Sequence, residues 1–125
     1  MSWITRTGNL AKAPELQEGT KGPYTYARVI VTDRIRNEDG TYTDGATTGY
    51  DVMVSGSQAR ELVVTAQRSG NVRITFSGRY RVTEWTGELG VRVQHEVQAD
   101  EVGISLRGQS VTVERGTPAS DDSPF

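Results

Sequence analysis

One stretch with helical periodicity stands among runs of alternating residues, and this arrangement limits the folds open to the chain. Between residues 57 and 70, apolar side chains recur at the spacing of one helix face: Ala59, Leu62, Val63 and Ala66. Ser57 is the expected N-cap of this helix, and Gly70 is its expected end. Elsewhere apolar and polar residues alternate, which is typical of strands with one side in a core. The pattern predicts three strands, one helix and two further strands.

Turn signals separate the five expected strands, which cover residues 2–8, 24–36, 49–55, 71–84 and 91–99. A polar loop over residues 18–23 precedes the second strand, and Asp44-Gly45 is interpreted as part of the loop before the third. Gly78 interrupts the fourth strand, where a bulge is expected. The fold class is all-β, and the element order is that of an OB-fold: a five-stranded Greek-key barrel with its helix between strands three and four. Other small barrels remain open on pattern alone.

The length of 125 residues fits one domain, which we assign to residues 1–115. Residues 116–125, rich in Gly, Pro, Ser and Asp, are expected to form a short disordered acidic tail. No apolar run suits a signal peptide or a membrane span, so a cytoplasmic protein is expected. The absence of cysteine excludes disulfides, thiolate metal sites and cysteine nucleophiles.

The charge balance neither requires nor excludes a nucleic-acid partner. The formal net charge is −2, but Asp121 and Asp122 lie in the tail, and residues 1–115 carry fourteen acidic and fourteen basic side chains. Twelve of these bases are arginines, which stack on bases as well as pair with phosphates. The domain is therefore neutral, with a composition that suits stacking.

Four groups of short motifs occur along the chain in a fixed order. They are Gly8-Asn9-Leu10 with Pro14-Glu15, Ser55-Gly56 before Ala59-Arg60-Glu61, Ser77-Gly78-Arg79-Tyr80 with Trp85 and Gly90, and Glu96-Val97 through Val102-Gly103-Ile104-Ser105-Leu106-Arg107. In this order they resemble the bacterial single-stranded DNA-binding protein family, in its actinobacterial form, over most of the chain. The resemblance implies a nucleoid-associated homotetramer that coats single-stranded DNA during replication, repair or recombination.

The C-terminus carries a separate resemblance to the same family. Asp121, Asp122, Pro124 and Phe125 are similar to the family's acidic tip, which replication and repair enzymes capture. A terminal Phe in an apolar pocket, with its carboxylate on a basic residue, is a sound recognition mode. Ser123 replaces the hydrophobic residue of the tip, so partner binding should be weakened; an inert polar tail is the alternative. Gly116 to Ser120 would be a shorter linker than the main family members carry, which indicates a secondary paralogue.

Trp85 is the first candidate for stacking on a base, because the resemblance places a stacking tryptophan at this position and Glu84 and Thr86 make its loop polar. Each stacked base contributes roughly 1–3 kcal/mol. The alternative is a tryptophan packed in a hairpin core. Tyr42 and Tyr50 are further candidates, as is Trp3, each either contacting DNA or packing. At three other positions where the family has a stacking aromatic residue, this chain has Ile35, Gly49 and Ser55. Weaker DNA binding than that of a typical member is therefore expected.

Four arginines are candidates for a phosphate track. Arg79 and Arg81 share one strand face with Trp85, while Arg34 and Arg36 lead toward Tyr42. Basic side chains along a stacking surface would follow the phosphates of a bound strand. The alternative is a solvated, charged strand face.

No set of residues suggests catalysis, a metal or a cofactor. His95 is the only histidine, and its position on the apolar side of a strand predicts a packed residue rather than a ligand or base. No phosphate loop, nucleophile elbow or metal spacing occurs. The main prediction is a DNA-coating protein; the alternative is an OB-fold adaptor or oligomerisation module that binds proteins, with weak or no DNA affinity.

Overall fold

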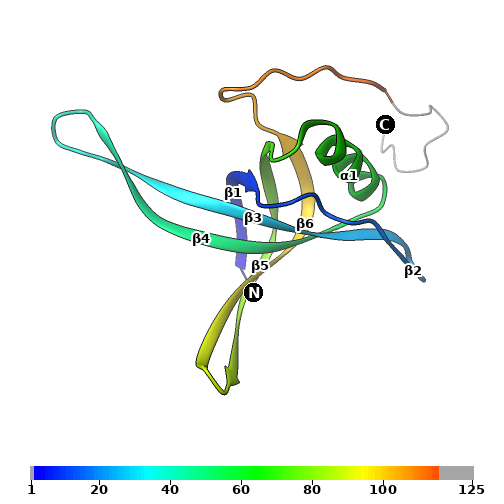
Figure 1. Ribbon diagram of the computed structural model, residues 1–125, viewed down its shortest axis with the longest axis horizontal. Helices are drawn as coiled ribbons and strands as arrows, with labels where there is room; N and C mark the ends of the chain where they lie inside the picture. Colours follow the sequence, from blue (N-terminus) through cyan, green and yellow to red (C-terminus); the bar gives the residue numbers. More distant parts are fainter. Residues whose placement is uncertain (1, 116–125) are drawn as a thin grey trace.

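The computed structural model describes residues 2–115 and contains seven regular elements in that range. They are β1 (Ser2–Leu10), β2 (Gln17–Gly19), β3 (Gly22–Arg36), β4 (Tyr42–Ser55), α1 (Ser57–Ser69), β5 (Arg73–Gly87) and β6 (Gly90–Ile104). Figure 1 shows them in sequence colours. The five predicted strands and the single predicted helix are all present, with β2 as a short addition.

The strands form a closed barrel. Their order in the sheet is β1-β5-β6-β4-β3-β2, and β1 also pairs with β3, which closes the first five into a ring. β4 and β6 run parallel, and the other pairs are antiparallel. Because β2 lies outside the ring, α1 falls between the third and fourth barrel strands. This is the OB-fold topology that the element order predicts.

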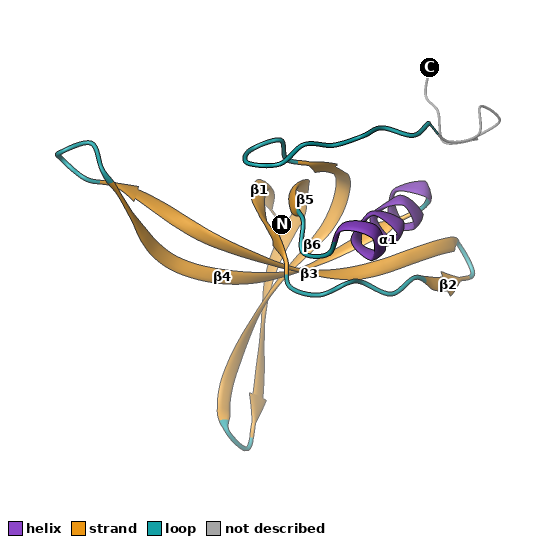
Figure 2. Cartoon of the chain, turned by 45° about the horizontal axis from the view of Figure 1, so that its top comes forward, coloured by secondary structure: helices purple, strands orange, loops and turns teal. Residues whose placement is uncertain are grey.

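Two long hairpins extend from the barrel as arms (Figures 1 and 2). We define the β3–β4 arm as residues 32–47 and the β5–β6 arm as residues 82–95. The expected third strand, 49–55, is too short, because β4 already begins at Tyr42. Asp44-Gly45 is therefore not a turn, and the chain reverses over Asn37 to Thr41, whose backbone groups are joined by an N–H to O bond of 2.8 Å. The predicted loop over residues 18–23 is likewise a hairpin, in which β2 pairs with β3.

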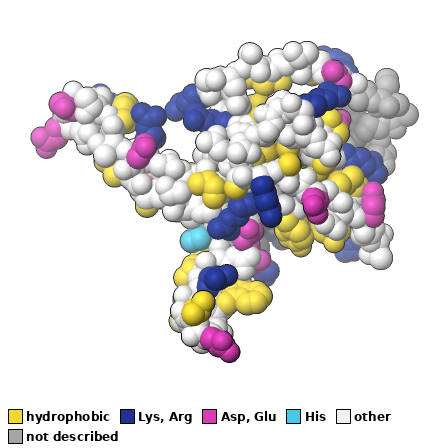
Figure 3. Space-filling model, in the orientation of Figure 1, with side chains coloured by type: hydrophobic (Ala, Val, Ile, Leu, Met, Phe, Trp, Pro, Cys, Tyr) yellow, Lys and Arg dark blue, Asp and Glu magenta, His cyan; other side chains and the backbone are white. Residues whose placement is uncertain are grey.

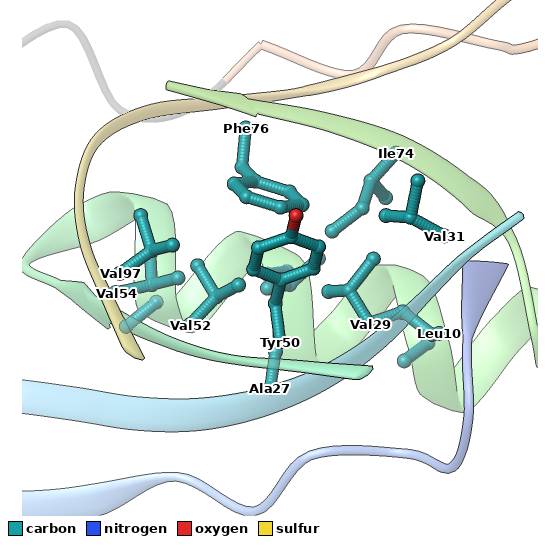
Figure 4. Packing of buried hydrophobic residues seen from close by; sticks show 13 residues of the cluster. Leu10, Ala27, Val29, Val31, Tyr50, Val52, Val54, Ile74, Phe76 and Val97 are labelled. Carbon is teal, nitrogen blue, oxygen red and sulfur yellow. The ribbon is translucent and has the colours of Figure 1, made fainter. Parts of the chain in front are cut away.

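The core fills the barrel and extends under α1. Phe76, Ile74, Val29 and Val52 are fully buried within it, and Tyr50 lies among them (Figure 4). These residues come from alternate positions of β3, β4 and β5, as the period of a half-buried strand requires. The helix contributes its predicted face, Ala59, Leu62, Val63 and Ala66, and packs against β3 and β4.

The N-cap of the helix lies one residue before the expected cap. Gly56, not Ser57, is the N-cap, with φ of 72°, and no side chain caps the first turn. This left-handed backbone favours glycine, so a serine cannot take that place without strain. Gly70 ends the helix as expected, and its N–H donates to the Ala66 carbonyl at 2.8 Å.

Gly78 lies at the predicted irregularity of β5. The register shifts between Ser77 and Gly78, so that Asp100 of β6 is the extra residue. A Cβ atom at position 78 would collide with the backbone of Gln98 and Ala99. Backbone cannot move aside as a flexible side chain can, so only glycine fits at this position.

We expect Gly78→Ala to lower the free energy of unfolding by about 1–3 kcal/mol, the usual cost of forcing atoms into a packed site. Urea denaturation followed by circular dichroism measures the change. Gly87→Ala is the matched control, because no atom lies within 4 Å of a Cβ built there. Equal midpoints for the two variants would contradict the argument.

Candidate nucleic-acid interface

A single row of residues crosses the outside of the barrel. The pairing registers place Trp3 of β1 beside Arg79 of β5, Arg79 beside Gln98 of β6, Gln98 beside Met53 of β4, and Met53 beside Tyr26 of β3. Directly paired residues share one face of a sheet. The row therefore has an aromatic ring at each end and a guanidinium between them. Trp3 is 56% exposed and Tyr26 is 64% exposed.

A groove lies along part of this row. The Tyr26 groove, as we name it, has a volume of about 400 Å³ and is lined by residues that include Tyr26, Asp51, Met53, Arg79, Arg81 and Glu96. It lies over four strands, β3, β4, β5 and β6. The Tyr24 ring supports Tyr26 in a T-shaped contact with a centroid separation of 5.8 Å. A flat, exposed and supported ring is what a stacked base requires.

Charge within the Tyr26 groove is largely neutralised. Arg81 Nε lies 3.1 Å from Glu96 Oε1. Asp51 Oδ1 lies 3.0 Å from Arg28 Nη1, and Gln94 donates to its other oxygen at 2.9 Å. Among residues 2–115, Arg79 makes no ion pair. The groove therefore offers apolar and aromatic contacts and one unpaired guanidinium, and it does not have a strong positive field.

Trp85 extends the same face onto the β5–β6 arm. Arg79, Arg81, Thr83 and Trp85 lie opposite Gln98, Glu96, Gln94 and Arg92, which confirms the expected shared face. Trp85 is 64% exposed, so the ring is not packed in a hairpin core. Arg92, directly opposite, has no ion pair within the described part of the chain. The arm thus presents an aromatic ring beside a free cation.

The remaining predicted cations lie on the other arm. Arg34 holds its guanidinium carbon 5.0 Å from the centroid of the Tyr42 ring, and Arg36 is paired directly opposite Tyr42. All three side chains are exposed. The structure therefore divides the predicted site into two groups, one on the β3–β4 arm and one on the face that carries Trp85.

Tyr50 is a core residue, which corrects its expected role as a stacking candidate. It is 6% exposed, and its ring centroid lies 5.5 Å from that of Phe76 and 5.9 Å from that of Tyr80. Arg6 Nη1 donates to its hydroxyl at 3.4 Å. A ring enclosed on this many sides has no face left for a base, so the interface excludes Tyr50.

Tyr80 and His95 pack beside Tyr50. Their rings stack with centroids 5.9 Å apart, and Tyr80 Oη lies 2.7 Å from His95 Nδ1. His95 is half-buried and packed, as its place on the strand predicts. Burial raises the pKa of Tyr80, so its hydroxyl stays protonated here.

In the exposed turn of the β3–β4 arm, the Thr41 hydroxyl lowers the pKa of Asp39 by donating to its carboxylate at 2.6 Å.

Sequence reasoning missed Tyr26 and Arg92. Tyr26 alternates with buried Thr25 and Ala27, so the period of residues 24–36 already placed it on the outer face. Arg92 could be found only once its partner on β5 was known. The sequence therefore contained a signal for Tyr26 and none for Arg92.

The predicted partner-binding residues Asp121, Asp122, Pro124 and Phe125 lie outside the described residues. Within residues 2–115, no helix is long and apolar enough to cross a membrane. The same residues contain no group of three or more His, Cys, Asp or Glu side chains placed to hold a metal ion.

The sequence matches no protein-family model and no curated protein. Among solved structures, the chain is similar to a small single-stranded DNA-binding protein from Streptomyces coelicolor, with 23% sequence identity and a TM-score of 0.73. The match covers 86% of this chain and 97% of the other. At this identity, the likeness establishes the OB-fold.

Proposed function

We propose that this protein binds and coats single-stranded DNA without sequence preference and catalyses no reaction, acting in DNA replication, repair or recombination. The observation that carries the proposal is the outer face with three exposed aromatic rings, Trp3, Tyr26 and Trp85, around the unpaired Arg79. The structural likeness to a single-stranded DNA-binding protein supports it.

In this mechanism, stacking on aromatic rings supplies the affinity, and arginines set the path of the DNA strand by binding its phosphates. Bases stack on Trp85 and Tyr26, each stacked base contributing roughly 1–3 kcal/mol. Every base has a π-face, so the contact does not distinguish sequences. Arg79 and Arg92 take phosphates, because neither is held by an acid within residues 2–115. The strand thus runs from the β5–β6 arm across the row of residues on the barrel.

The assembly we propose is a homotetramer of domains spanning residues 1–115. Its support is the amount of exposed apolar surface, since Val82, Val91 and Val93 share the side of the β5–β6 arm opposite Trp85 and each is about half exposed or more. Apolar groups clustered in this way commonly mark contact surfaces. Light scattering should give four times the mass of one chain.

Residues 116–125 are proposed to bind replication and repair enzymes through their acidic tip.

Intrinsic fluorescence tests the DNA-binding proposal. In Trp3→Phe, Trp85 is the sole tryptophan, and we expect oligothymidine to quench its emission strongly at low salt and less at high salt. Duplex DNA is the control, because its stacked bases are not available to the ring. Absence of quenching by both DNAs would overturn the proposal.

A second function is favoured by two observations. The domain is neutral overall and has an exposed valine face on its β5–β6 arm, which would suit an adaptor that binds proteins. A protein that shows no fluorescence response to DNA should then be pursued through its protein partners.

A further inference from the structure

A second groove lies beside the β3–β4 arm. The Arg73 groove, as we name it, has a volume of about 440 Å³ and lies between that arm, β1 and the segment that follows β6. Arg34 and Asp44 line it from the arm, Arg73 from the start of β5, and Arg107 from the segment that follows β6. Figure 3 shows basic side chains on the arm and on the segment facing it, across the hollow between them.

The charge of the Arg73 groove differs from that of the Tyr26 groove. Three guanidinium groups line it against one carboxylate, and among residues 2–115 none of the three makes an ion pair. The Tyr26 groove instead has two arginines against two acids. Positive charge that lines a groove attracts anions. Only in the Arg73 groove, of these two, is this charge not compensated by acidic side chains.

The backbone segments that carry two of these cations are held in position, and the third cation rests on an aromatic ring. The Gln109 amide nitrogen donates to the carbonyls of Arg73 at 2.7 Å and Ser105 at 2.6 Å, which fastens the segment carrying Arg107 to β5. Arg34 rests on the Tyr42 ring. Holding cations in place before a ligand arrives reduces the ordering cost of binding. Among residues 2–115 no aromatic side chain lines the groove, so the described part offers contacts to phosphates and none for stacking bases.

We propose that the Arg73 groove binds the phosphate backbone of a second segment of the same DNA strand that crosses the Tyr26 groove. The inference rests on the proposed function and adds a second site to it. β3 connects the two grooves, because Tyr26 and Arg34 lie eight residues apart on alternate positions of one strand, about 26 Å at the usual rise. A strand that stacks on Tyr26 therefore reaches the second groove by following β3.

The test compares two oligothymidine lengths on Arg73→Gln/Arg107→Gln. A strand of about 5 nucleotides fills one groove, whereas one of about 15 nucleotides spans both, within the site sizes usual for an OB-fold. We expect the variant to bind the longer strand about tenfold more weakly at low salt and the shorter strand as the wild type does. The slope of log K against log salt for the longer strand should fall by about 1.4, since each lost phosphate contact contributes roughly 0.7.

Arg60→Gln is the matched control, because it removes one exposed arginine from α1, outside both grooves, and should change neither affinity. Unchanged binding of the longer strand by the double variant, or equal weakening of both strands, would overturn the proposal. Inorganic tripolyphosphate tests the groove without DNA: it should shift the amide resonances of Asn9, Arg73 and Arg107 in the wild type only. Absence of these shifts overturns the anion site itself, whereas shifts without any oligonucleotide binding would overturn the DNA strand as its occupant and the proposed function with it.

Discussion

Replacing Trp85 and Tyr26 together by alanine should lower the affinity for oligothymidine by about thirtyfold or more. Each ring is 64% exposed and lies on the outer face that carries Arg79. The loss of two stacked bases, at roughly 1–3 kcal/mol each, predicts this fold-change. Because neither ring belongs to the core, the thermal midpoint should remain close to that of the wild type. Fluorescence anisotropy of a labelled oligothymidine measures the affinity.

Two comparisons make this prediction specific to stacking. Trp85→Phe/Tyr26→Phe keeps a π-face at both positions and should retain most of the affinity. Leu89→Ala removes a fully exposed apolar side chain from the tip of the β5–β6 arm and should have little effect. A loss in the leucine variant as large as that in the double alanine variant would show that apolar area, rather than stacking, holds the DNA.

Phe76→Ala should lower the free energy of unfolding by about 3–5 kcal/mol, the usual cost of removing a large buried ring. Phe76 has no exposed surface and lies against Tyr50 in the centre of the barrel. The cavity left behind lies within a packed core, so neighbouring residues can refill it only in part. Urea denaturation monitored by circular dichroism gives the value.

Ile74→Val serves as the comparison for this core prediction. Ile74 is as buried as Phe76 and lies on the same side of β5, but the change removes one methylene and should cost about 0.5–1.5 kcal/mol. If Phe76→Ala were no more destabilising than Ile74→Val, the barrel would have to collapse around the missing ring, contrary to the packing described.

Alternation and helical spacing predict most of the barrel because both are local. The strand over 24–36, the helix face and the shared face of Arg79 and Trp85 follow from period alone. The early start of β4 does not: Asp44-Gly45 has the composition of a turn, yet pairing with β3 keeps it extended, with a register shift near Thr32. Cross-strand pairing here overrides a local turn preference.

The candidate site is less predictable than the fold, because it depends on register between distant strands. Trp3 and Arg79 are neighbours only through the pairing of β1 with β5, which no local pattern specifies. Tyr50 is a different case. Its alternation with Val52 and Val54 already placed it in the core, and its candidacy came only from standing beside the position where related proteins have a stacking aromatic.

Because of the two arms, stability and strand affinity depend on different residues. In a compact barrel without arms, the same residues would have to provide both. A two-stranded ribbon that extends from the barrel contributes little to the stability of the domain, so its side chains can change without loss of the fold. Trp85, Arg92, Arg34 and Tyr42 all lie on such ribbons. Evolution can therefore retune strand affinity one substitution at a time, while Phe76 and its neighbours remain constrained by packing. A chain of this kind can diverge in binding strength long before it diverges in shape.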